Sequence, residues 1–472
     1  MNTKLTETDP ENEETDYQSD DAYKGFALVL IAAAIICFFV VLHNQPAKTS
    51  ADNAISKVSG TKGYQAEDPK EYWSIKGTIG DFTAGVAGTL FSFAGFVLLY
   101  LSLKKQSEAN VMQQKAFNHD KTEGRFFELL KLHRDNVSDI KYSLVKREKI
   151  TDEKGVKEIF ETNIFESRHF FLAALEQFEE AYNELSHMFH KWPLEEIYTS
   201  EYLLTLKKNK EINTRNIDLL EYARIDIIYL IVFFGVSKSG IETVKSLTHN
   251  RYDLTFMSYI LAFAALKPQQ RSVYWTQWDL TNKLKPTDLI TLRFNLANHR
   301  LGKEVDVNCF KQISVIDGKQ TMLVNPYYPD KYEKYYGGHQ FRLGHYFRHL
   351  YQTISFIDSS KELSSNEMYG YIRHLRGQLS TAEQILIFLN SLSQLGRIWE
   401  LEEKKHGSAM PDAKQLITKY MIIKNIPNDV IFADIRISDY YPNVVFEGFD
   451  VPENKIIKEA ALQREQIRTD MV

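Results

Sequence analysis

The sequence has few of the residues that cross-link a fold or interrupt its helices. Only two of its 472 residues are cysteines, Cys37 and Cys309. A disulfide framework and a four-cysteine zinc site are therefore both excluded. Glycine (22) and proline (12) are scarce, which disfavours an all-β chain with many tight turns. The net charge of −5 excludes nucleic-acid binding by bulk positive charge.

Several catalytic signatures are also missing. The chain has no GxxxxGK[ST] phosphate-binding loop, no HExxH zinc motif, no paired CxxC and no GxSxG nucleophile elbow. These absences disfavour nucleotide hydrolysis, zinc proteolysis and esterase chemistry, so we assign neither a cofactor nor a metal. Hydrophobic residues make up 44% of the chain and aromatic residues 13%, which is ample material for a core.

Two long apolar runs near the N-terminus predict membrane spans. Residues 25–42 contain no charge and would form about 27 Å of helix, enough for a slightly thin bilayer. The preceding tail carries eight acidic residues and only two lysines, unlike the basic start of a signal peptide. Residues 79–103 contain the second run, which begins at Phe82. The lipid bilayer is therefore a predicted partner.

Charges beside the two spans predict the topology. Lys24 precedes the first span, and Lys104 and Lys105 follow the second. The positive-inside rule then places both termini in the cytoplasm. The predicted order is an acidic tail (1–24), a first span (25–42), a short extracytoplasmic loop (43–78), a second span (79–103), a juxtamembrane helix (104–150) and a soluble domain (151–472). This order predicts an inner-membrane protein whose bulk is cytoplasmic.

Small residues form a stripe along the second span. Ala84, Gly88, Ser92 and Gly95 share one helix face, where small side chains let helix backbones approach closely in lipid. Two interpretations are open. The stripe packs on the first span within one chain, or it joins protomers into a homo-oligomer.

The soluble region has mainly helical patterns. Helices are predicted at residues 158–191, 341–358, 366–378 and 380–395, together with a buried core helix at 225–236 that is too short to span a membrane. The last long helix starts with a capping box, Ser380 and Glu383, and is expected to end before Gly396. Asp317-Gly318 predicts a β-hairpin within 312–324, and 430–446 is expected to hold a short strand or two. The fold class is mainly α: two N-terminal transmembrane helices, then a large helical soluble domain with a small β-hairpin element.

Several sequence blocks carry a family resemblance. Gly337-Gly338-His339 leads into LGHYFRHLYQTISFID at 343–358, and YGYIRHLRGQLSTAEQILIFLNSLSQLG follows at 369–396. These blocks resemble the phage abortive infection proteins of the AbiC-like family. Three further stretches fit it: GDFTAGVAGTLFSF at 80–93, FFELLKLHRDNV at 126–137 and YLIVFFGV at 229–236. Gly377 departs from the pattern, which has Ala there. The resemblance implies a role in antiphage defence, without a defined reaction.

The helix at 341–358 offers candidate functional residues. Its apolar stripe includes Leu343 and Phe347, and Arg342, His345 and His349 lie on the opposite side. His345 and His349 could share a metal, or a histidine and an arginine could act on a phosphodiester. The alternative is a solvated polar face. Two further arginines are candidates within the family blocks, Arg348 and Arg376, the latter as an anion or carboxylate partner.

A ribonuclease of the HEPN type is the sharper version of this hypothesis. That motif has an arginine and a histidine separated by four to six residues. Arg342 and His349 have six residues between them, and Arg293 and His299 have five. Roughly 1.5 such pairs are expected by chance, so two are background. The residues after the arginines, Leu343 and Phe294, are apolar where the motif has a polar one.

Three functional interpretations are therefore open. The first is a membrane-anchored antiphage sensor or effector with a phage-derived trigger as partner. The second is a membrane-tethered HEPN-like ribonuclease, for which nucleic acid is the partner. The third is a membrane scaffold with no role in defence. Whether the protein is an enzyme stays open. Glu383 and Asn390 are expected to be structural, as a helix cap and a hydrogen-bonded core group.

Overall fold

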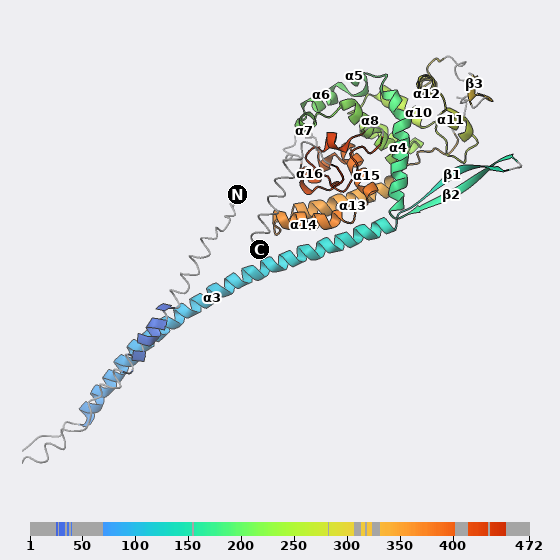
Figure 1. Cartoon of the computed structure of the whole chain (residues 1–472). Coiled ribbons are helices and arrows are strands. Elements are labelled where there is room, and N and C mark those ends of the chain that lie inside the picture. Colours follow the sequence, from blue (N-terminus) through green and yellow to red (C-terminus); the bar gives the residue numbers. More distant parts are fainter. Residues whose placement is uncertain are drawn as a thin grey trace, which may run out of the picture. The chain divides into compact units, whose positions relative to one another are not determined.

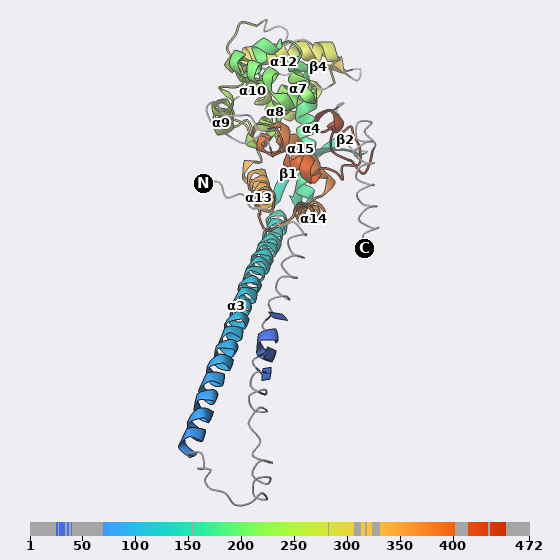
Figure 2. The same cartoon turned by 90° about the vertical axis from the view of Figure 1, so that its left-hand side faces the viewer.

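The computed structural model describes residues 25–26, 28–33, 35–36, 39, 69–152, 155–281, 283–305, 313–316, 319–322, 331–401, 414–432 and 435–449. The chain divides into two compact units, Met1–Asp120 and Lys121–Val472. The boundary lies within helix α3, Pro69–Ser138, which is continuous in both views (Figures 1 and 2). The predicted acidic tail at 1–24 lies outside the described residues.

Helix α3 contains the predicted second span. Among the described residues it is the one helix long and apolar enough to cross a membrane, judged by length and composition alone. Its most apolar 18-residue stretch has a mean hydropathy of 1.9, and 12% of that stretch is buried. The helix already begins at Pro69, so the last residues assigned to the loop at 43–78 are helical. The first span, 25–42, is only partly described and stays a prediction.

The small-residue stripe lies on an exposed face of α3. Ala84, Gly88, Ser92 and Gly95 are all exposed, and a Cβ added at either glycine would meet no atom within 4 Å. The buried positions of this segment include Ala94 and Leu101, on the other side of the helix. In the part of the first unit that the structure describes, the stripe therefore packs on nothing.

A long hairpin follows α3 and corrects the predicted secondary structure. The sequence predicted helix to residue 150 and again from 158. The structure instead ends α3 at Ser138 and pairs β1 (Lys141–Asp152) with β2 (Gly155–Glu166) in antiparallel register, from Lys141↔Glu166 to Asp152↔Gly155 (Figure 1). The lysines and glutamates of both strands favour helix locally. Alternating apolar residues and the two-residue connection outweigh that preference.

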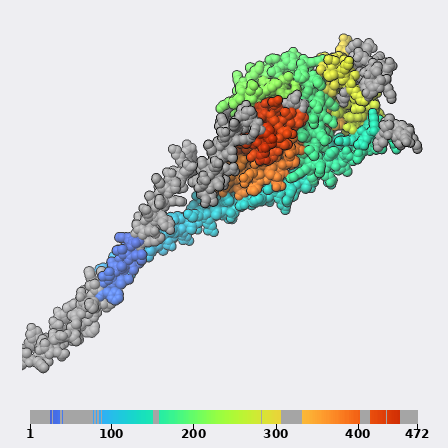
Figure 3. All heavy atoms as spheres, viewed as in Figure 1, coloured from blue at the N-terminus to red at the C-terminus, as the bar shows by residue number. Residues whose placement is uncertain are grey.

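The rest of the second unit is helical. Its helices are α4 (His169–Phe189), α5 (Leu194–Ile197), α6 (Ser200–Lys208), α7 (Lys210–Thr214), α8 (Leu219–Phe234), α9 (Lys238–Thr248), α10 (Leu254–Ala264), α11 (Trp275–Thr281), α12 (Pro286–Arg300), α13 (Gln340–Asp358), α14 (Ser365–Arg376), α15 (Thr381–Leu392), α16 (Leu416–Tyr420) and α17 (Ile437–Tyr440). The predicted core helix is α8, which is buried from Tyr222 to Phe233 and packs on α4 and α15. Figure 3 shows the C-terminal elements, orange to red, against the green helices.

Most local predictions in the C-terminal half are confirmed. Strands β3 (Ile313–Ile316) and β4 (Lys319–Met322) form the predicted hairpin, whose turn lies outside the described residues. Helices α13, α14 and α15 lie where the patterns placed them, and Ser380 and Glu383 form the capping box. The described residues of 430–446 form an isolated Val430↔Arg436 bridge and α17 instead of strands.

The end of α15 differs from the prediction. The helix is capped by Ser393, three residues before Gly396. Gly396 instead precedes the short 3-10 helix η2, Arg397–Trp399. A Cβ at Gly396 would lie 2.3 Å from the backbone oxygen of Asn390. The glycine is therefore required by a close backbone approach and does not act as a helix cap.

A crossing of two backbone segments joins the end of α8 to the start of α13. The Val236 N–H donates to the Tyr336 carbonyl at 2.9 Å, and the His339 N–H donates to the Phe233 carbonyl at 2.8 Å. Gly235 (φ +75°) and Gly338 (φ +91°) both have left-handed φ values. A Cβ on Gly338 would lie 2.6 Å from the Phe234 carbonyl oxygen. Two of the sequence blocks behind the family resemblance therefore meet at this crossing.

Replacing a glycine at the crossing should destabilise the soluble region. Gly338→Ala adds both an unfavourable φ and a clash with backbone, which together should cost about 3 kcal/mol or more. Gly370→Ala is the control, because a Cβ there meets nothing within 4 Å and alanine favours helix α14. Chemical denaturation of the two variants measures the difference. Equal stability of the two variants would contradict the close backbone contact at Gly338.

Candidate functional site

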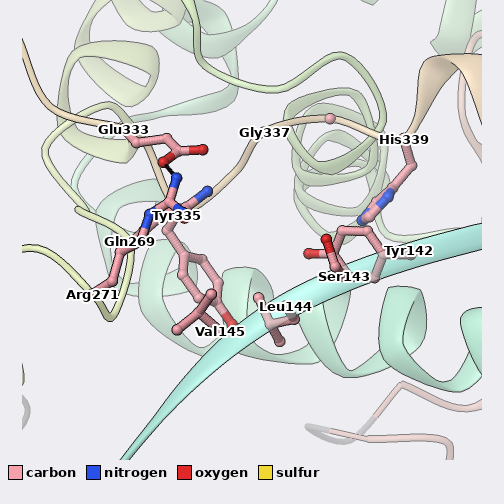
Figure 4. Close-up of a pocket in the computed structure, with 11 residues that line it drawn as sticks. Tyr142, Ser143, Leu144, Val145, Gln269, Arg271, Glu333, Tyr335, Gly337 and His339 are labelled. Atoms are coloured by element: carbon pink, nitrogen blue, oxygen red, sulfur yellow. Dashed lines mark ion pairs between the residues drawn. The ribbon is translucent and has the colours of Figure 1, made fainter. Parts of the chain in front are cut away.

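A cleft lies between strand β1 and the segment that leads into α13 (Figure 4). Its volume is about 130 Å³. It is lined by residues 142–145, 269, 271, 333, 335 and 337–339. All of these belong to the second unit. The cleft thus combines the hairpin that the sequence did not predict with the Gly-Gly-His block that it did single out.

His339 is the buried polar side chain of this cleft. It occupies the N-cap position of α13 without a capping hydrogen bond from its side chain, and it is 1% exposed. Its Nε2 lies 2.8 Å from the side-chain oxygen of Gln177, whose amide nitrogen donates to the Tyr142 hydroxyl at 2.5 Å. Because that amide oxygen can only accept, Nε2 carries the proton. The buried Nδ1 is then an acceptor, and it has no partner.

The charge state of His339 is fixed by its surroundings. Burial, together with the positive charge of Arg342, lowers the pKa of His339 to about 3. The rings of Tyr142 and Phe170 contact the imidazole edge to face, with centroid distances of 5.0 and 5.3 Å. At neutral pH the imidazole is therefore uncharged and rigidly held. It can accept a hydrogen bond but offers little as a general base.

Ion pairs close the other end of the cleft. Arg271 pairs with Glu333 at the rim (Figure 4). Behind them the Lys267 ammonium lies 3.7 Å from the Tyr335 ring centroid and donates to Glu184 at 2.8 Å. Burial raises the pKa of the Tyr335 hydroxyl. The charged groups are already paired and the Tyr335 hydroxyl keeps its proton, which disfavours proton transfer at this end of the cleft.

The predicted Arg/His face of α13 is divided between structure and solvent. Arg342 donates from Nε to the Lys141 carbonyl at 2.8 Å, and its guanidinium lies over the Tyr142 ring. His345 and Arg348 are exposed. His349 is half-buried. The structure therefore gives these four side chains different environments.

His349 stacks on His133 of α3. Their ring centroids are 6.1 Å apart, and the two ring nitrogens of His349 have no hydrogen-bond partner. His133 is 3% exposed and also contacts the Tyr346 ring. His133, His345 and His349 do not form a three-ligand metal site, because their ligand atoms do not all lie within 4.8 Å of one another. No spacing in the sequence indicates the His133 contact, since it joins helices far apart in the chain.

The other arginine candidates bind backbone carbonyls. Arg293, of the second Arg/His pair, is 4% exposed and donates to the Glu184 carbonyl. Arg376 is 6% exposed and donates to the carbonyls of Tyr420 and Met421 at 3.2 and 3.0 Å. Each guanidinium is thus bonded to backbone carbonyls instead of facing an open anion site.

Glu383 and Asn390 have the structural roles expected of them. Glu383 is 0% exposed; it accepts from the Ser380 N–H at 2.8 Å and from the Tyr346 hydroxyl at 3.1 Å. The Asn390 amide donates to the Tyr229 hydroxyl at 2.9 Å in the core. Sequence reasoning missed Gln177, because an isolated glutamine in an apolar helix carries no distinctive spacing.

The His133 contact should make stability depend on pH. Burial, then the charges of His349 and Arg168, lowers the pKa of His133 to about 4. Its unfolded pKa is about 6.5, so the unfolded chain takes up the proton first and stability falls from pH 6.5 towards 4. When the pH is lowered from 7.5 to 5, this histidine should reduce the free energy of unfolding by about 2 kcal/mol.

Urea denaturation at the two pH values measures this loss. His133→Phe should reduce the pH dependence by that amount. Phe126→Leu is the control. Phe126 lies on the same helix as His133, and its buried ring packs on Tyr371. This variant should lower stability equally at both pH values. An unchanged pH dependence in His133→Phe would contradict the burial of a neutral imidazole.

The comparisons with known proteins bear on the same region. A family model described as "Putative phage abortive infection protein" matches residues 338–431, about one fifth of the chain. The match begins at Gly338 and includes α13, α14 and α15, which confirms the family resemblance over these residues. A search of curated proteins and a search of solved structures each found no match.

Proposed function

We propose that this protein is a membrane-anchored phage-defence protein that acts by recognising a phage-derived partner. The observation that carries this proposal is the family match over residues 338–431, which contains α13 and the cleft residues Gly338 and His339. A phage-defence role agrees with the three earlier sequence blocks, two of which, at 126–137 and 229–236, lie in the second unit.

The membrane anchor is supported by α3. Its apolar side chains between Val86 and Leu103 are unusually exposed for a protein in water, for example Phe96 at 65% and Leu99 at 59%. A run of this kind is stable when lipid covers it. We place the bulk of the chain in the cytoplasm, following Lys24, Lys104 and Lys105.

The contacts that the candidate residues already make favour recognition over catalysis. The arginines of both predicted ribonuclease pairs, Arg293 and Arg342, already donate to backbone carbonyls. His339 is a neutral acceptor with a depressed pKa. A nuclease would need a free cation and a titratable histidine facing one substrate position, and the described residues offer no such pair in the cleft.

Charges placed in the apolar run of α3 should hinder insertion of the second predicted span. The double variant Leu98→Lys, Leu99→Lys should cost up to about 2.5–3.5 kcal/mol of insertion free energy for each lysine, the value for the centre of a span. Alkaline extraction should show weaker membrane attachment, because only the first predicted span, 25–42, is left unchanged. Plaque assays should show loss of phage protection at normal abundance. Leu204→Lys, at an exposed position of α6, is the control and should keep both. Full protection by a variant with weakened attachment would contradict a requirement for anchoring through α3.

The exposed stripe on α3 motivates a test of assembly. We propose that the stripe joins protomers, so Gly88→Leu should weaken helix contact in lipid by about 1–3 kcal/mol. Crosslinking in membranes should then yield fewer oligomers at unchanged protein abundance. Val86→Leu, on a different face of the helix, should leave crosslinking unchanged. If Gly88→Leu and Val86→Leu give the same crosslinked yield, the stripe does not mediate assembly.

A further inference from the structure

We propose that the open edge of β1 within the cleft binds an extended peptide segment of a partner protein by strand addition. That this partner is phage-derived rests on the function proposed above. The binding mode itself rests on the outward backbone groups of β1 that line the cleft.

The direction of the β1 backbone groups follows from two contacts. The Lys141 carbonyl accepts from Arg342 at 2.8 Å, and the Arg147 N–H donates to the Gln270 side chain at 2.8 Å. Both partners lie outside the hairpin, so the N–H and C=O groups of these residues point away from β2. Along an antiparallel strand this direction repeats every second residue. The N–H and C=O groups of Ser143 and Val145 must therefore also point away from β2.

Ser143 and Val145 line the cleft. In the described part of the chain their outward N–H and C=O groups have no hydrogen-bond partner. They offer two donors and two acceptors along one edge. The body of the protein holds the strand before and after them, at Lys141 and Arg147, so the free stretch is fixed in place. An unpaired edge of this kind is a template for another strand.

The far side of the cleft is also made of extended chain. Tyr335 donates its N–H to the Lys267 carbonyl, and the chain then turns at Gly337 and Gly338 into α13. That turn leaves the β1 edge uncovered. His339 also lines the cleft, but its unpartnered Nδ1 is buried away from solvent.

These features favour a peptide over a compact solute. Alternating donors and acceptors along a strand edge match a polypeptide backbone and few other ligands. The predicted ligand is an extended segment whose backbone pairs with Ser143 and Val145.

The register of the hairpin supplies a matched pair of variants. Val145 pairs directly with Thr162 of β2. Proline lacks an N–H and is tolerated on a strand edge, so Val145→Pro removes a donor that faces the cleft. Thr162→Pro removes the equivalent donor from the opposite edge of the same hairpin. Neither variant removes a bond between β1 and β2.

The experiment uses the full chain in lipid nanodiscs and a random seven-residue peptide library displayed on yeast. Selection on the wild type should enrich peptides, and fluorescence polarisation of a synthetic, labelled peptide should give its affinity. Val145→Pro should weaken binding by at least about tenfold, because the donor is lost and the ring blocks approach. Thr162→Pro should bind within about twofold of the wild type. Hydrogen exchange at Ser143 and Val145 should slow when the peptide is added.

A second measurement does not depend on the folding of the variants. Methylation of the peptide's own backbone nitrogens, one at a time, should abolish binding at every second residue only. The proposal is overturned if no peptide is enriched, if Val145→Pro binds as the wild type does, or if methylation has no alternating effect. It is also overturned if the chain alone shows slow exchange at Ser143 and dimerises through this edge.

Plaque assays separate this proposal from the defence function. If peptides bind as expected and Val145→Pro still protects fully, strand addition stands and its use in sensing phage fails. If peptides do not bind while the wild type protects and the Leu98→Lys, Leu99→Lys variant does not, membrane-anchored defence stands and strand addition is rejected.

Discussion

The glycine crossing between α8 and α13 is the constraint on which the rest of the second unit depends. Gly235 and Gly338 let two backbones approach so closely that a Cβ on either would overlap main-chain atoms. The two hydrogen bonds across it fix the start of α13 against the end of the buried helix α8. His339 is therefore presented to Gln177 of α4 with one ring nitrogen bonded and the other free. This backbone contact fixes the positions of the cleft walls.

Buried ion pairs hold the surrounding helices in one arrangement. Arg397 pairs with Asp226 of α8 at 2.7 Å, and Arg215 pairs with Glu400 at 2.6 Å. Breaking such a pair leaves a buried charge without a partner, at a cost of about 3–5 kcal/mol. Asp226 also accepts from the Tyr252 hydroxyl at 2.6 Å. These pairs connect elements distant in sequence, and each of these buried charges has a partner of opposite charge.

Local patterns predicted the elements whose stability is local. The capping box of α15, the core helix α8 and the β3–β4 hairpin all depend on neighbours in the chain, so their sequences are sufficient to indicate them. The β1–β2 hairpin was missed because its lysines and glutamates suit an exposed helix equally well. Only the pairing register and the packing of Tyr142 favour strands over a helix here. The candidate site shows the same division. His339 belonged to a recognisable block, whereas its partners Gln177 and Tyr142 lie in other elements, and no spacing in the sequence connects them.

The order of elements links the cleft to the proposed anchor. Only two residues separate the end of α3 at Ser138 from the start of β1 at Lys141, and Ser167 donates from its hydroxyl back to the Ser138 carbonyl. Arg342 of α13 binds Lys141 itself. A segment that adds to β1 would therefore act on a strand whose first residue is fastened to the family-matched helix and whose chain continues directly into α3. Since α3 also carries the apolar run, the proposed recognition site and the proposed anchor share one covalent path.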